Sequence, residues 1–276
     1  MSDFWIIVLT ALVGFGTGVL SGMFGVGGAI VSTPAIRALG ATPIAAVAST
    51  LPSIIPGAIS GALRYRRDEL VDVRIALWTS TTGVFAAVAG ALLVDVVPGG
   101  GHALMLLTAG LVAFSAFRLA QPALVPETAV ELAVEGVTDA GPHAEIHSAG
   151  AVRDEWWRPT VIGAGAGLLS GLLGIGGGLL MVPLFTGWLR LPIKAALGTS
   201  LACVAVFAVP GTITHALLGH IDWLYALPLC IGIVPGARVG SSLAIRSSDR
   251  TLRLVVGGAL GSIALVYCIG EVIAVA

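Results

Sequence analysis

Two glycine clusters interrupt long apolar stretches of this sequence, and both could bind an anion with backbone groups alone. The clusters read GVGG from Gly25 to Gly28 and GIGG from Gly174 to Gly177. A helix that begins directly after such a cluster directs its free N–H groups and the positive end of its dipole at whatever lies in front of it. Glycine suits this position because it has no Cβ to block a ligand and adopts positive φ without strain.

Hydroxyl side chains near the clusters could donate hydrogen bonds to the same anion. Ser21 and Ser170 precede the clusters by about one helical turn, and a hydroxyl donates without the desolvation cost of a full charge. The alternative for each hydroxyl is a bond to a carbonyl of its own helix, four residues earlier. The predicted substrate-binding set is Ser21, Gly25, Gly27, Gly28, Thr50, Ser170, Gly174, Gly176, Gly177, Gly178, Thr199, Ser200 and Arg238.

The charged and titratable residues within the apolar stretches each have two interpretations. Arg238 is either a functional intramembrane cation or a side chain that reaches the cytoplasmic surface near Arg246. His215 could carry a coupling proton, or it could face the membrane interface. Asp72 and Asp222 occupy matching segment starts, so we expect them to cap helices rather than to bind substrate.

One proline–glycine pair interrupts the second apolar element in each half of the chain. The pairs are Pro56-Gly57 and Pro210-Gly211. Proline removes a backbone donor and kinks a helix, so these residues are predicted hinges.

The composition places all of these residues in a membrane. The chain has 276 residues, of which 57% are hydrophobic and 11% charged, and its mean hydropathy is +1.00. Apolar stretches near or above the roughly 20 residues that cross a bilayer recur along it, which favours an all-α polytopic bundle. The three cysteines occur singly, so no metal and no cofactor is expected.

The sequence is built from one unit used twice. GVLSGMFGVGGAIVSTPAI, which begins at Gly18, returns as GLLSGLLGIGGGLLMVPLF from Gly167, an offset of 149 residues. We predict an N-terminal transmembrane repeat over residues 1–120, a polar cytoplasmic linker over 121–157 and a C-terminal transmembrane repeat over 158–276. The predicted apolar elements are residues 4–39, 43–63, 73–97 and 102–120, followed by 159–189, 192–218, 222–246 and 252–275.

Cationic loops indicate that the two halves have inverted topology. Equivalent loops carry opposite charge patterns, and the positive-inside rule places the cationic ones in the cytoplasm. An inverted repeat needs an odd number of crossings per half, which follows if each glycine-broken first element is a re-entrant hairpin. The fold is then six spans plus two hairpins, with both termini outside; the alternative is eight spans. The cationic residues are Arg64, Arg66, Arg67, Arg74, Arg190, Lys194, Arg246, Arg250 and Arg253.

The paired motif G-x-x-S-G-x-x-G-hydrophobic-G-G-[GA], followed by a proline, resembles the sulfite exporter TauE/SafE family, also called the toluene sulfonate uptake permease family. ALGTSL from Ala196 and the G-A-R ending at Arg238 also resemble it. The resemblance implies a multi-pass protein of the plasma or inner membrane that exports sulfite or organosulfonates. Two departures occur: Ala29 matches Gly178, and AST from Ala48 matches GTS in the second half.

The expected partners are a small anionic substrate, the lipid bilayer and a coupling proton or cation; no nucleic acid is expected, and the oligomeric state stays open. The alternatives are a carrier of another small anion and a non-transporting membrane scaffold. An enzyme is not expected, because the sequence has no H-E-x-x-H, no G-x-S-x-G and no clustered intramembrane acids.

Overall fold

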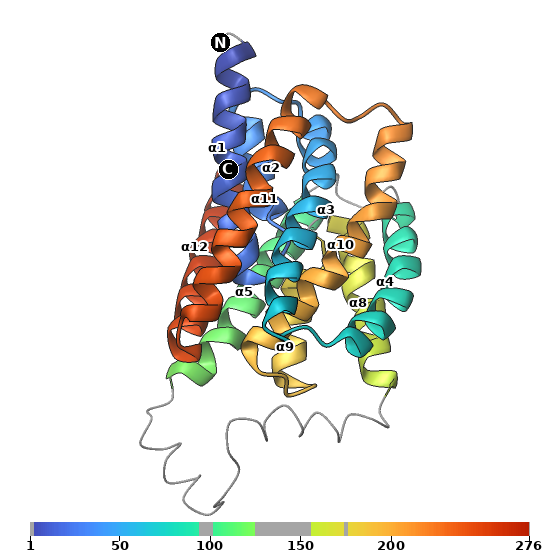
Figure 1. Ribbon diagram of the computed structural model, residues 1–276. Helices are drawn as coiled ribbons and strands as arrows, with labels where there is room; N and C mark the ends of the chain where they lie inside the picture. The colour runs from blue at the N-terminus through green and yellow to red at the C-terminus, as the bar shows by residue number, and fades with distance from the viewer. Residues whose placement is uncertain (1–2, 94–101, 125–155, 174–175, 276) are drawn as a thin grey trace, which may run out of the picture.

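The computed structural model describes residues 3–93, 102–124, 156–173 and 176–275. Within these ranges the backbone forms ten helices and no strand (Figure 1). The helices of the first half are α1 (Asp3–Phe24), α2 (Ala29–Ala38), α3 (Pro43–Arg67), α4 (Val73–Leu93) and α5 (His102–Leu124). Those of the second half are α8 (Trp157–Leu173), α9 (Gly178–Gly187), α10 (Ile193–Leu217), α11 (Trp223–Arg246) and α12 (Asp249–Val275). Most of the predicted linker, residues 125–155, lies outside the described residues.

The first predicted element of each half forms two helices separated by glycines. Between α1 and α2, φ is +73° at Gly25, +84° at Gly27 and +82° at Gly28. Between α8 and α9 it is +83° at Gly176 and +72° at Gly177. Residues other than glycine rarely adopt these positive φ values. The glycines therefore allow the chain to leave one helix and enter the next.

The connections between helices gather at two ends of the bundle. At one end the α2–α3 connection meets the start of α11, where the Tyr225 hydroxyl donates to the Leu39 carbonyl at 3.4 Å. At the opposite end Lys194 at the start of α10 lies 3.5 Å from the Asp249 carboxylate at the start of α12. Figure 1 shows the α3–α4, α9–α10 and α11–α12 connections together at this second end, away from the N-terminus. The predicted cationic loops therefore share one end.

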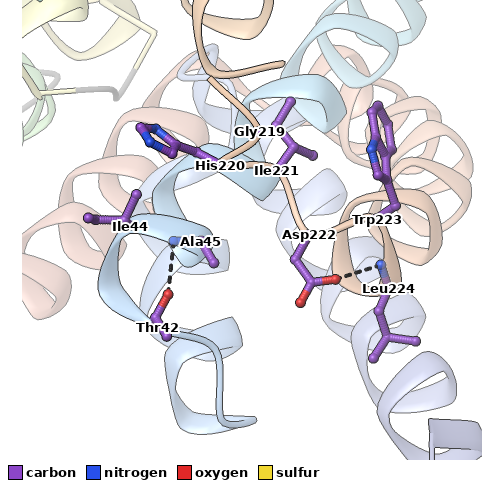
Figure 2. Close-up of a pocket in the computed structure, with 9 residues that line it drawn as sticks. All are labelled: Thr42, Ile44, Ala45, Gly219, His220, Ile221, Asp222, Trp223 and Leu224. Carbon is purple, nitrogen blue, oxygen red and sulfur yellow. Dashed lines mark hydrogen bonds between the residues drawn. The ribbon is translucent and has the colours of Figure 1, made fainter. Parts of the chain in front are cut away.

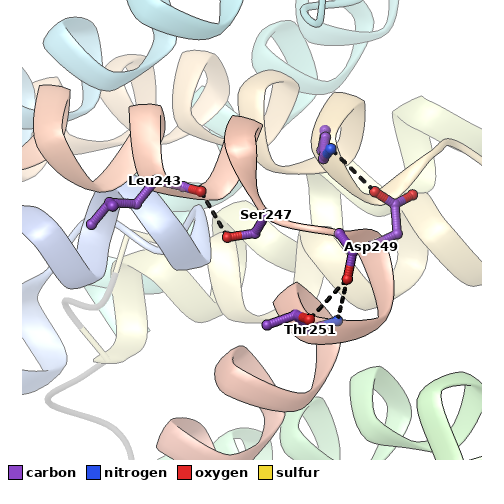
Figure 3. A network of polar contacts seen from close by, with 6 residues as sticks. Leu243, Ser247, Asp249 and Thr251 are labelled. Atoms are coloured by element: carbon purple, nitrogen blue, oxygen red, sulfur yellow. Dashed lines mark hydrogen bonds and ion pairs between the residues drawn. The ribbon is translucent and has the colours of Figure 1, made fainter.

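Figure 3 shows the polar contacts at the start of α12, at the cationic end. The Ser247 hydroxyl donates to the Leu243 carbonyl at 2.8 Å, and the same carbonyl accepts the Ser247 N–H at 3.0 Å. The Thr251 N–H donates to the Ser248 hydroxyl at 3.2 Å, which caps α12.

Helix length, hydropathy and aromatic placement make this a multi-pass membrane protein. Five helices in the described part of the chain are long and apolar enough to cross a bilayer. Tryptophans mark the cationic end in two contacts, Trp78 with Trp156 at 5.9 Å and Trp157 with Trp188 at 5.5 Å. Exposed aromatic residues at both ends fit the headgroup regions of a membrane. At the other end these are Phe4 and Trp5 at the start of α1 and Trp223 at the start of α11.

Glycine contacts join helices of different halves. On α1, a Cβ at Gly18 would lie 2.5 Å from the Ile233 carbonyl oxygen of α11, and one at Gly14 would lie 2.7 Å from that of Leu229. The α8–α4 interface is built in the same way, with Gly163 against the Thr79 carbonyl. Such close approach lets helices pack without a hydrophobic driving force. Five glycines at four-residue spacing contact the backbone of a neighbouring helix in this way, namely Gly14, Gly18, Gly22, Gly163 and Gly167.

The two halves are therefore interlocked. α1 packs chiefly on α11, and α8 packs chiefly on α4, so each main interface takes one helix from each half. The central helices α3 and α10 also pack on each other, and α5 packs on α12. The buried core between them includes Ile54, Leu197 and Leu201, each at most 1% exposed.

Candidate functional site

The two glycine segments meet at the buried centre of the bundle. A Cβ at Gly178 would overlap the Gly25 carbonyl oxygen and would lie 2.7 Å from the Val26 Cα, so the two backbones are in direct contact. The Ser200 hydroxyl of α10 donates to the same Gly25 carbonyl at 2.8 Å. Their contact brings residues from both halves of the sequence together.

Side chains from other helices satisfy the backbone at the buried end of α1. Its last turn leaves carbonyls without helical partners, and such groups are costly inside a membrane. The Gly25 N–H donates to the Ser21 carbonyl at 2.9 Å, and the hydroxyl of the fully buried Tyr65 donates to the Gly22 carbonyl at 3.0 Å. Sequence reasoning missed Tyr65, because no local signal marks a tyrosine that reaches a helix 43 residues away.

The N-termini of α2 and α9 converge on this centre. Gly28 and Gly177 occupy the N-cap positions in left-handed conformation, and no side chain caps either helix. The first residues after them, Ala29 and Gly178, are buried. Two positive helix ends therefore lie near each other in a region of low dielectric, where a negative charge would be stabilised.

The predicted hydroxyl of Ser21 is buried and has no hydrogen-bond partner. Its side chain is 1% exposed, and its Oγ makes no hydrogen bond. It lies against the start of α2, since a Cβ at Gly28 would be 3.4 Å from the Ser21 Cβ. A buried hydroxyl without a partner costs about 1–3 kcal/mol, so it is available to a ligand at this position.

Other predicted hydroxyls hold the protein together. The Thr199 hydroxyl accepts the Asp72 N–H at 3.0 Å, and in the corresponding place the Ser49 hydroxyl accepts the Asp222 N–H at 2.9 Å. Thr50 donates to the Val47 carbonyl of its own helix at 2.8 Å. For Thr50 the hydroxyl therefore bonds to its own helix, which was the alternative to a role in binding. The carbonyl that accepts is three residues earlier rather than four.

Three other predicted binding residues, Ser170, Gly174 and Arg238, are not seen together at the centre. Ser170 is 7% exposed in the last part of α8, before the second glycine segment, and Gly174 lies outside the described residues. Arg238 is exposed on α11 rather than buried at the centre.

The predicted hinges lie within continuous helices. Pro56 follows the start of α3 by 13 residues, whereas Pro210 follows the start of α10 by 17. The two pairs are therefore one helical turn apart along helices of equal length. Their glycines face different neighbours: Gly57 packs on Ile233 and Gly211 on Leu51.

Asp72 and Asp222 are helix caps, as predicted. The Asp72 carboxylate accepts the Ile75 N–H at 3.0 Å, and the Asp222 carboxylate accepts the Leu224 N–H at 3.0 Å. Asp222 also lines a surface pocket of about 710 Å³ at the end away from the cationic loops (Figure 2). Its other lining residues are Thr42, Ile44, Ala45, Gly219, His220, Ile221, Trp223 and Leu224.

Comparisons with known proteins identify one family and several membrane proteins to which this chain is similar. The family described as "Sulfite exporter TauE/SafE" matches residues 10–267. A "Probable membrane transporter protein" of Xylella fastidiosa (strain 9a5c) is 29% identical over 86% of this chain and 83% of its own length. "Probable membrane transporter protein YdhB" of Bacillus subtilis (strain 168) is 27% identical over 85% of this chain and 89% of its own length.

A shorter match adds local similarity only. "Probable membrane transporter protein YunE" of Bacillus subtilis (strain 168) is 36% identical over 32% of this chain, and the match covers 33% of that protein. No solved structure matches the chain.

Proposed function

The chain belongs to the sulfite exporter TauE/SafE family of membrane transporters, and from this premise we propose that it exports small sulfur-containing anions such as sulfite or organosulfonates. The observation that carries the proposal is the contact of two glycine segments, each followed by a helix N-terminus, at the buried centre. That arrangement offers backbone N–H groups and two dipole ends to one anion.

In this proposal the anion binds between the starts of α2 and α9. The Ser21 hydroxyl donates to it from the α1 side, because this hydroxyl is buried and has no protein partner. Ser200 and Thr199 support the site indirectly, since their hydroxyls hold the Gly25 carbonyl and the start of α4. The anion therefore replaces no existing hydrogen bond of Ser21 when it enters.

The proposed topology is an inverted repeat with two re-entrant hairpins. Helices α2 and α9 have 10 residues each, about 15 Å of helix, which is half of a bilayer. The cationic connections share one end of the bundle, which the positive-inside rule places in the cytoplasm. Residues 1–120 and 158–276 then form the two repeats, and residues 121–157 form a cytoplasmic linker.

Alternating access in this fold moves units that mix the two halves. Close glycine contacts join α1 to α11 and α8 to α4, so a rocking motion of one sequence half against the other would break both interfaces. The proposed moving units are these cross-half pairs, and the central site lies between them.

The second candidate function is transport of another small oxyanion. The proposed ligands would bind such an anion as well as they bind sulfite. The proposed ligands are backbone N–H groups and a hydroxyl, which recognise negative charge and oxygen rather than sulfur. A thermal-shift screen of sulfite, sulfonates, carboxylates and inorganic oxyanions on purified protein separates the two candidates by which anion stabilises the fold most.

The central test is sulfite export from a sulfonate-degrading host that carries Gly27→Val or Gly176→Val. Both glycines have positive φ, so valine strains the segment that forms the site. The expected result is loss of export at normal expression. Undiminished export by both variants would remove the glycine segments from the mechanism.

Deletion of residues 126–149 tests the scaffold alternative. A transporter should keep its export activity without this segment, whereas a scaffold that binds partners through it would lose them.

A further inference from the structure

Two histidines lie together at the end of the bundle opposite the cationic loops. His215 is in the last turn of α10, and His220 follows that helix. The His215 Nδ1 and the His220 Nδ1 are 3.3 Å apart, and their ring centroids are 5.5 Å apart. Both side chains are half-buried, and His220 lines the pocket of Figure 2. This pair lies outside the central site, and nothing in the proposed transport mechanism uses it.

The backbone holds the two imidazoles in this arrangement. Gly219 has φ of +69°, the His220 N–H donates to the His215 carbonyl at 3.1 Å, and the Gly219 N–H donates to the Ala216 carbonyl at 3.2 Å. These bonds form a Schellman motif, in which the residue after the left-handed glycine contacts the residue five positions earlier. That contact is usually made by two apolar side chains, and here both are imidazoles.

The distance between the two nitrogens suits two ligands of one metal ion. Two imidazole nitrogens bound to a tetrahedral zinc ion at about 2.0–2.1 Å are roughly 3.3–3.4 Å from each other. The same distance also fits a hydrogen bond in which one Nδ1–H donates to the other Nδ1, so a metal ion would replace that bond. The C-terminal end of α10 also carries the negative end of the helix dipole, which favours a cation.

We propose that His215 and His220 bind a divalent transition metal ion such as zinc through their Nδ1 atoms. No third His, Cys, Asp or Glu joins them within the described residues, so water from the open pocket completes the coordination. The Asp222 carboxylate lines the same pocket, but Figure 2 shows it turned toward the Leu224 N–H that it caps. Imidazole ligands suit zinc, copper and nickel better than calcium or magnesium.

The test is zinc binding by calorimetry to the full chain, purified without a polyhistidine tag. His143→Ala and His147→Ala form the background, because these linker histidines would otherwise compete. We expect one zinc ion per chain, and His215→Leu and His220→Leu should each weaken zinc affinity at least about tenfold. Leucine preserves the apolar contact of the Schellman motif, and an unchanged metal-free Tm confirms that each variant folds.

His102→Leu is the matched control and should bind zinc as the background protein does. The joint variant His215→Cys/His220→Cys should recover zinc binding under reducing conditions, since thiolates are also zinc ligands. Zinc affinity that is the same in both leucine variants as in the background would overturn the proposal. So would zinc binding that is absent from the background and present only when His143 and His147 are restored.

Discussion

Gly178→Ala should destabilise the protein because there is no room for a methyl group between Gly178 and the Gly25 carbonyl. The new Cβ would overlap the Gly25 carbonyl oxygen and would lie 2.7 Å from the Val26 Cα. Both neighbours are backbone atoms, so no rotamer change relieves the overlap, and the two segments must separate. Overpacking of this kind typically costs about 1–3 kcal/mol.

A thermal-unfolding assay in detergent measures this effect. In a chain of this size each kcal/mol corresponds to about 2–4 °C, so Tm should fall by roughly 2–12 °C. Sulfite export should fall as well, because the separation displaces the N-terminus of α9 from the centre. The equivalent position in the first half is Ala29. The reverse change, Ala29→Gly, should lower the free energy of unfolding by at most about 1 kcal/mol, which is the difference in helix propensity between alanine and glycine.

Gly16→Ala is the matched control. Gly16 is exposed on α1, and a Cβ there would meet nothing within 4 Å. Alanine is a better helix former than glycine by about 1 kcal/mol, so Tm should be equal or slightly higher. If Gly178→Ala behaved like Gly16→Ala in both Tm and export, the close contact between the two glycine segments would be refuted.

Three further predictions test the hydroxyls and the topology. Ser200→Ala and Tyr65→Phe each leave a buried carbonyl without its donor, so each should lower the free energy of unfolding by about 1–3 kcal/mol in chemical denaturation; no change in either would contradict the observed bonds. Ser21→Ala should leave stability unchanged or raised, because this hydroxyl has no partner, yet should raise the KM for sulfite in vesicle transport. Cysteines at Ser2 and Ala276 should react with impermeant maleimide from outside the cell, and cytoplasmic labelling of either would exclude the re-entrant hairpins.

The course of the helices was predictable because it depends on local sequence. The apolar stretches predicted over 43–63 and 192–218 correspond to α3 and α10, and the element over 4–39 divides at its glycines. The caps Asp72 and Asp222 were also predictable, since a carboxylate at a segment start reaches N–H groups two or three residues later.

The roles of the central hydroxyls were not predictable in the same way. Ser21 and Ser200 both lie near a glycine cluster or in the element after it, and both were predicted ligands. Only the packed structure separates them, because Ser200 donates to a carbonyl 175 residues away while Ser21 has no partner. Arg238 was a candidate because it is a cation within an apolar stretch, and its exposure depends on the face of α11 that packs on α1.

The sequence alone determined the membrane class and the family resemblance, and it predicted the duplicated unit and the positions of the glycine breaks, because composition, spacing and φ preference depend on the local sequence. The tertiary structure decided that α1 packs on α11 rather than within its own half, that Gly178 faces the Gly25 carbonyl, and that His215 and His220 face each other across a helix end. The first two depend on contacts between residues more than 100 positions apart. The third depends on a left-handed turn at Gly219 that brings the two rings to the same side.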